Sequence, residues 1–211
     1  MSAADVVPAV PAAIPLSLLE AIRGLDTPPE GVDELAVEVV ARRLGLSATV
    51  AAQIVRYRAA AEAGETVPRD EAVAVFRLVG RRPDAALAFA DAGRRVARHA
   101  ARQRTGAGRA VQKLTPDVVG ARLGRRAATR LAREVLGAEL RFRGGIAEAR
   151  LADPLSLRAL PDGAACAFYS AAFAELLRQL TGFEGTTPHE RCRGRGDDTC
   201  LWRAAPAEEL A

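Results

Sequence analysis

Glycine and proline divide this chain into segments of helical length, and this spacing constrains its fold more than any other feature. Glycine just after an apolar periodic segment is typical of a helix C-terminus, and proline is typical of a first turn. Over residues 17–104, glycine follows four such segments, at Gly24, Gly45, Gly64 and Gly80. Pro83 stands at the start of the next one. The spacing therefore predicts helices over 17–24, 33–44, 48–63, 69–79 and 83–103.

The second half of the chain mixes helical and period-2 patterns. We predict a helix over 115–136, strands over 140–143 and 146–151, a loop over 153–163, and a helix over 165–181 that ends at Gly182. Two short strands should follow within 185–203. The expected fold class is α+β, with a helical N-terminal region and then a small α+β domain with an antiparallel sheet and a C-terminal hairpin.

The domain organisation follows from the same pattern. Residues 1–16 contain three prolines and no periodicity, which predicts a flexible leader. The helical region takes residues 17–104, and the stretch Thr105–Gly108 is the best boundary in the sequence. The α+β domain should then occupy 110–205, with an alternative start near residue 85.

Composition excludes wholesale disorder and a membrane protein. Hydrophobic residues make up 49% and charged residues 27% of the chain, which is close to the globular average. The apolar runs fall short of the roughly 18 to 20 residues that a membrane span needs. The N-terminus lacks the basic stretch of a secretory signal. We therefore expect a cytoplasmic protein that has no membrane partner.

The net charge of +4 is concentrated in residues 66–160, which suggests an anionic partner or simply a coding bias towards arginine. Residues 33–63 have the short glycine-containing turn of a helix-turn-helix, with Arg56 and Arg58 on the second helix. Residues 1–65 are net acidic, however. We therefore favour a packing role for these helices and keep a DNA-binding transcription regulator as an alternative.

All three cysteines lie in the last 46 residues, and His189 precedes one of them by three positions. Thiolates and an imidazole in one compact region are the ligands that zinc prefers. Cys192 and Cys200 are symmetric about Gly196, so a hairpin turning there would place them opposite one another. Cys166 begins a predicted helix, where a thiolate is favoured. We predict a zinc site. A Cys192–Cys200 disulfide and independent burial of the three thiols are the alternatives.

The residues around these cysteines resemble the 4-vinyl reductase domain family, closely over 163–203 and loosely over 85–203. The likeness lies in a cysteine that enters an apolar helix ending in glycine, a ligand residue three positions before Cys192, and a Gly-Asp turn before Cys200-Leu-Trp202. The resemblance implies a small α+β domain, often a homodimer, whose apolar cavity senses a hydrophobic or aromatic ligand. It also implies structural zinc at Cys166, Cys192 and Cys200, with His189 where the family usually has an acidic ligand.

The fourth zinc ligand is a choice between two neighbouring residues. In a regular strand, residues two apart share a face, so Glu190 would point with Cys192. The family spacing and the affinity of imidazole for zinc favour His189 instead, and Pro188 makes an irregular strand entry plausible. We predict His189, with Glu190 as the alternative.

The apolar face of helix 165–181 is the candidate ligand-binding surface. An apolar stripe at this spacing is equally typical of ordinary core. The ligand-binding candidates are Phe168, Tyr169, Phe173, Leu177 and Trp202. The chain has no dinucleotide-binding glycine motif, so we favour binding over catalysis. A tetrapyrrole carrier or vinyl reductase of bacteriochlorophyll synthesis is the alternative.

Overall fold

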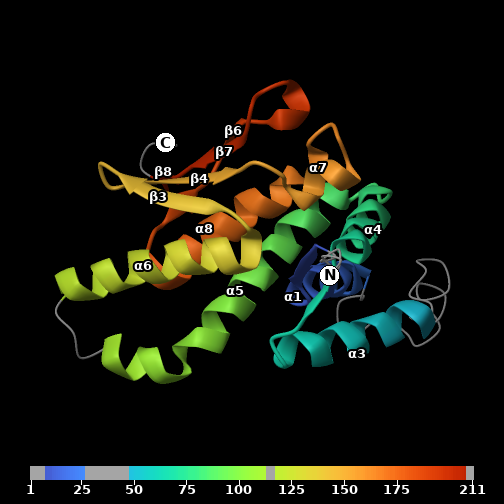
Figure 1. Cartoon of the computed structure of the whole chain (residues 1–211), viewed down its shortest axis with the longest axis horizontal. Coiled ribbons are helices and arrows are strands. Elements are labelled where there is room, and N and C mark those ends of the chain that lie inside the picture. Colours follow the sequence, from blue (N-terminus) through green and yellow to red (C-terminus); the bar gives the residue numbers. More distant parts are fainter. Residues whose placement is uncertain (1–7, 27–47, 113–116, 208–211) are drawn as a thin grey trace, which may run out of the picture.

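The computed structural model describes residues 8–26, 48–112 and 117–207, with the side chains of 104–119 excepted. It has the expected α+β architecture, in which an antiparallel sheet lies over a group of packed helices (Figure 1). The helices are α1 (Ala13–Asp26), α3 (Ala48–Glu62), α4 (Arg69–Gly80), α5 (Ala85–Gln112), α6 (Asp117–Leu136), α7 (Leu155–Ala159) and α8 (Ala167–Thr181).

The main sheet has four antiparallel strands in the order β3-β4-β7-β6. These are β3 (Glu139–Arg143), β4 (Ile146–Leu151), β6 (His189–Arg191) and β7 (Cys200–Arg203). Two small antiparallel pairs accompany it. They consist of β1 (Ala9–Pro11) with β2 (Thr66–Pro68) and β5 (Gly185–Thr186) with β8 (Ala205–Pro206). The predicted C-terminal hairpin is therefore confirmed as β6–β7, and it joins a sheet begun by the predicted β3–β4 hairpin.

Most of the predicted helices are confirmed, and α5 is longer than expected. It continues to Gln112 and so runs through the Thr105–Gly108 stretch that suggested a domain boundary. The division into two domains itself stays a prediction. Residues 27–47 lie outside the described residues, and with them the predicted helix 33–44 and the turn of the helix-turn-helix. On α3, Arg56 pairs with Glu71 and Arg58 pairs with Glu20, both at 2.6 Å.

Two sequence expectations are wrong. The predicted flexible leader forms β1 and the start of α1 over residues 9–16, because Val10 pairs with β2 and Ile14 and Leu16 are buried. Pro15 fits there, since the first turn of a helix does not need its N–H. The predicted loop 153–163 contains the short helix α7, which begins after Pro154 and buries Leu155.

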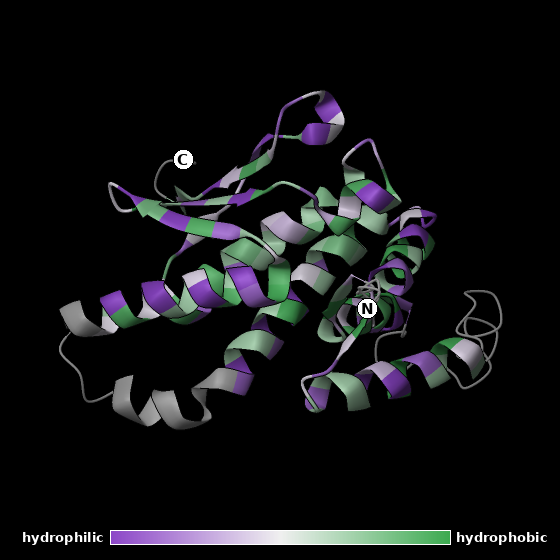
Figure 2. Cartoon of the chain, viewed as in Figure 1, coloured by the Kyte–Doolittle hydropathy of each residue, from purple (hydrophilic) through white to green (hydrophobic). Residues whose placement is uncertain are grey.

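One continuous core joins the N-terminal helices to the sheet. Its spine is a series of ring contacts that runs from α4 and α5 through α8 to β7, with centroid separations of 5.2 to 5.7 Å. Its members are Phe76, Phe89, Phe168, Tyr169, Phe173 and Trp202. Figure 2 shows hydrophobic residues gathered where α5 and α8 cross, and hydrophilic residues along α6 and at the tip of the β6–β7 hairpin.

Glycine allows α8 to lie against both α5 and α6. A Cβ added to Gly93 of α5 would lie 2.1 Å from the Phe168 carbonyl oxygen, and one added to Gly124 of α6 would lie 2.0 Å from the Leu180 carbonyl oxygen. Contacts this short are sterically forbidden. Glycine is unfavourable inside a helix, but the crossing of α6 with α8 requires it at Gly124.

A buried carboxylate also ties α8 to α5. Glu175 is 5% exposed and accepts hydrogen bonds from Arg98 of α5 and from Arg178 and Gln179 of its own helix, at 2.8 to 2.9 Å. Burial acts to raise its pKa, but the bonds from Arg178, Gln179 and Arg98 outweigh burial and lower the pKa to about 2.

Acid should therefore weaken the α5–α8 contact. The lowered pKa of Glu175 means that its contribution to stability is complete above the unfolded pKa, near 4.5, and is lost as the pH falls towards 2. We expect Glu175→Gln to lower the free energy of unfolding by about 1 to 2 kcal/mol at pH 7, and the gap to the wild type to narrow between pH 4.5 and 3. Urea denaturation at pH 7, pH 4.5 and pH 3 measures this difference in the free energy of unfolding.

Glu139→Gln, in an exposed pair with Arg141, is the control and should leave the stability and its pH dependence nearly unchanged. A constant gap from pH 7 to pH 3 would contradict the assignment.

Candidate metal centre

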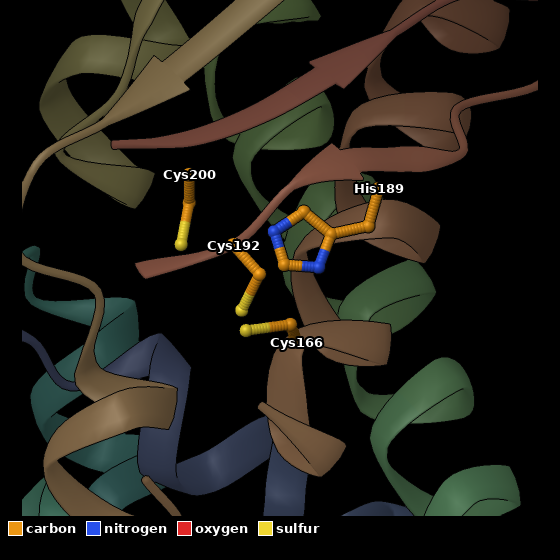
Figure 3. Close-up of side chains that lie close together, drawn as sticks. All are labelled: Cys166, His189, Cys192 and Cys200. Carbon is orange, nitrogen blue, oxygen red and sulfur yellow. The ribbon is translucent and has the colours of Figure 1, made fainter. Parts of the chain in front are cut away.

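Three cysteines and one histidine from separate segments converge beneath the C-terminal hairpin (Figure 3). Cys166 stands in the turn that precedes α8, His189 opens β6, Cys192 follows β6, and Cys200 opens β7. One ligand atom from each residue lies within 4.8 Å of all the others. In a tetrahedral zinc site with Zn–S bonds near 2.3 Å, two sulfurs lie about 3.8 Å apart. The four side chains therefore need to move by about 1 Å or less to surround one ion.

The three thiols are free and buried. Burial and, to a lesser extent, the sulfurs of Cys192 and Cys200 raise the pKa of Cys166 to about 12. A hydrogen bond with Ser156 acts in the opposite direction. Burial also raises the pKa of Cys200, while the backbone N–H of Arg193 lowers it by donating to Sγ at 3.4 Å. Thiolates packed this closely repel one another, so a bound cation is the partner that would stabilise them.

The structure brings His189, and not Glu190, into this cluster. Glu190 is exposed, whereas the Nε2 atom of His189 is buried and has no hydrogen-bond partner among the described residues. Burial lowers the pKa of His189, and Arg195 lowers it further, so the imidazole stays neutral, as a metal ligand must be. Its ring stacks on Trp202, with centroids 4.3 Å apart and planes 7° apart.

A β-bulge explains why the regular-strand argument for Glu190 fails. His189 pairs with Trp202 and Arg191 with Leu201, so two residue steps on β6 oppose a single step on β7. The extra residue breaks the alternation of faces. His189 can therefore face the same way as Cys192, although the two are three residues apart.

The turn between Cys192 and Cys200 directs a backbone N–H towards one of the sulfurs. Residues Arg193–Arg195 form a 3-10 turn, and Gly196 takes a φ of +97°, as the predicted turn requires. The Cys192 N–H donates to Asp197 at 2.7 Å, which fixes the start of the turn. The Arg193 N–H is then aimed at the Cys200 sulfur. The turn thus holds two ligands and supplies a donor to one of them.

Sequence reasoning missed the residues that support the cluster. Gly163 has a φ of +82°, and a Cβ there would lie 2.9 Å from the Cys192 sulfur, so the backbone closes one side of the site. A Cβ at Gly194 would lie 2.3 Å from the Pro161 carbonyl oxygen, so glycine is needed there as well. Ser156 of α7 contacts the Cys166 sulfur at 3.2 Å. Gly163 ends the predicted loop 153–163, but only the fold of this segment places it beside the cysteines.

The predicted ligand-binding residues divide between the core and two cavities. Phe168, Phe173 and Trp202 are buried in the aromatic spine. Tyr169 is also buried, accepts a hydrogen bond from the Leu155 N–H, and lines a cavity of about 390 Å³ beside β1. Leu177 lines another cavity, of about 240 Å³, between α6, α8 and the β3–β4 hairpin. Ligand binding by the five residues stays a prediction.

Comparisons with family models, with curated proteins and with solved structures find no match for this chain. Among the described helices, none combines the length and the apolar character needed to cross a membrane.

Proposed function

We propose that this chain binds and senses a small hydrophobic or aromatic molecule in a zinc-stabilised domain that resembles the 4-vinyl reductase family. The observation that carries the proposal is the convergence of Cys166, His189, Cys192 and Cys200. These residues are the ones to which the family resemblance assigns zinc. An apolar cavity in the same α+β unit supplies room for the ligand.

The donor set fits a structural zinc ion. Three sulfurs and one imidazole fill a tetrahedral coordination sphere, and such closed sites stabilise folds, whereas catalytic sites keep one position open. The ligand residues would tie the hairpin to the start of α8. Strand β7 carries both Cys200 and Trp202, and Trp202 packs on Tyr169 and Phe173 of α8. An ion bound by Cys200 would therefore also hold the sheet against α8.

The cavity of about 240 Å³ has the size and lining for a small ligand. Its walls include Phe142, Phe183, Leu177, Ile146 and Ala121. Apolar walls with few polar groups are typical of sites for small molecules. A ligand there would contact α6, α8 and the β3–β4 hairpin at once.

Sensing would follow from the packing of α8 on α5. A ligand that fills the cavity stiffens α8 and the hairpin, and α8 meets α5 at the close Gly93 crossing. The change would pass through α5 to α1 and α4, with which α5 also packs. Coupling of this kind needs a difference in order between the free and bound states.

Thermal shift and native mass spectrometry of zinc-loaded protein test this function. Phenol, toluene and octan-1-ol are the probes, and we expect at least one to raise the melting temperature, since ligand at ten times its Kd adds about 1.4 kcal/mol of stability. Ala121→Trp should block the cavity and abolish the shift. Ala59→Trp, on the exposed side of α3, should preserve it.

Two outcomes would count against ligand sensing. Either the three probes leave the melting temperature unchanged, or Ala121→Trp responds to them as the wild type does. New absorbance bands with a free porphyrin, without any response to phenol, would favour the tetrapyrrole alternative.

A further inference from the structure

A groove lined by arginine adjoins the apolar cavity. It has a volume of about 620 Å³, and it is lined by residues of α6 together with Phe142 of β3. Five arginines and one glutamate line it. Its lining residues include Arg122, Arg125, Arg126, Arg130, Arg133 and Glu134. Arg130 pairs with Glu134 at 2.7 Å, and the others give the groove a strong positive charge. A concentration of one sign of charge in a hollow attracts anions.

Arg125 and Phe142 belong to both hollows. Each lines the arginine groove and also the apolar cavity of about 240 Å³. Among the described residues that line the cavity, Arg125 carries the only charge. Its guanidinium lies over the Phe142 ring, 5.3 Å from the centroid. A cationic group therefore stands at the junction of an apolar site and a basic one.

From this junction we infer that the ligand is an amphipathic anion, with an apolar body in the cavity and a carboxylate or phosphate head on Arg125. This inference rests on the proposed function and adds the head group to it. A guanidinium binds such heads through two parallel hydrogen bonds. The remaining arginines draw the anion towards the junction, and Phe142 separates the two environments.

A neutral ligand would leave the basic groove unused. An extended polyanion such as single-stranded nucleic acid would use the groove but not the cavity. The sharing of Arg125 and Phe142 by the two hollows favours a molecule that has both parts.

Isothermal titration calorimetry of the zinc-loaded full chain with octanoate and octan-1-ol tests the inference. The two probes share an eight-carbon chain and differ in the head group. We expect octanoate to bind about tenfold more tightly than octan-1-ol, as one charge-assisted contact provides. Arg125→Gln should remove this preference and leave the affinity for octan-1-ol unchanged. Its melting temperature without ligand should stay near that of the wild type.

Two further variants distinguish a specific contact between Arg125 and the ligand head from general electrostatic attraction by the groove. Arg122→Gln changes the groove but not the cavity and should weaken octanoate binding by about twofold, because it alters only the local field. Arg81→Gln, an exposed residue after α4, should have no effect. Equal affinity for the two probes, or equal loss of octanoate binding in Arg122→Gln and Arg125→Gln, would overturn the inference.

Different experimental outcomes would contradict the anionic head group and the proposed ligand binding. If octan-1-ol binds as well as octanoate, the cavity has a ligand and the anionic head is wrong. If neither octanoate nor octan-1-ol binds, the inference fails, and the proposed function fails with it only if phenol and toluene also leave the melting temperature unchanged. Salt-dependent binding of a 12-mer single-stranded oligonucleotide, tighter than that of octanoate and lost equally in both groove variants, would assign the groove to nucleic acid and overturn the inference.

Discussion

Replacing Cys200 with alanine should release the metal and unfold the C-terminal hairpin. Structural zinc supplies about 10 to 16 kcal/mol of apparent binding free energy in zinc-finger peptides, so release of the ion should lower the free energy of unfolding by at least about 3 kcal/mol. Cys200 is fully buried at the start of β7, and without the ion the sulfurs of Cys166 and Cys192 lose the partner that holds hairpin and helix together. Elemental analysis gives the zinc content, and urea denaturation gives the free energy of unfolding.

The neighbouring pair of candidate fourth ligands provides a matched control. His189→Ala should lose zinc as Cys200→Ala does, whereas Glu190→Ala should keep one zinc per chain, because Glu190 is exposed outside the cluster. Wild-type protein treated with a strong chelator should be as unstable as Cys200→Ala. Wild-type protein that carries no stoichiometric zinc, and that added zinc does not stabilise, would rule out the metal centre.

A methyl group at Gly93 should disrupt the crossing of α5 and α8. The added Cβ would lie 2.1 Å from the Phe168 carbonyl oxygen and 2.9 Å from the Ala172 nitrogen, and these backbone atoms cannot move without shifting α8. Alanine has the better helix propensity, by about 1 kcal/mol. Overpacking nevertheless outweighs it, and we expect Gly93→Ala to lower the free energy of unfolding by about 3 kcal/mol in urea denaturation.

Gly182 separates this steric effect from the cost of replacing any glycine. It ends α8 at a φ of +70°, and a Cβ there meets open space. Gly182→Ala should therefore cost about 1 kcal/mol, from the left-handed backbone alone. A Gly93→Ala variant no less stable than Gly182→Ala would show that α5 and α8 can separate at little cost.

Local sequence patterns were sufficient to predict most helices and strands, because each of these elements depends on residues close in sequence. Glycine at 64, 80 and 182 ended helices as predicted, and the period-2 pattern located β3 and β4. The same reasoning failed at residues 9–16. The three prolines of residues 1–16 suggested a flexible leader, while pairing with β2 and burial of Ile14 and Leu16 decided the outcome. Such contacts connect residues more than 50 positions apart and leave no local pattern.

By itself, the sequence determined the chemistry of the site: three thiols and an imidazole clustered near the C-terminus, in a chain whose fold class is α+β. Tertiary structure alone decided that His189 and not Glu190 joins the cysteines, because a β-bulge changes which face a residue occupies. It also decided that Gly163 closes the site and that Arg125 lies where an apolar cavity meets a basic groove. These arrangements depend on segments brought together by packing, and the spacing of residues along a chain does not specify that.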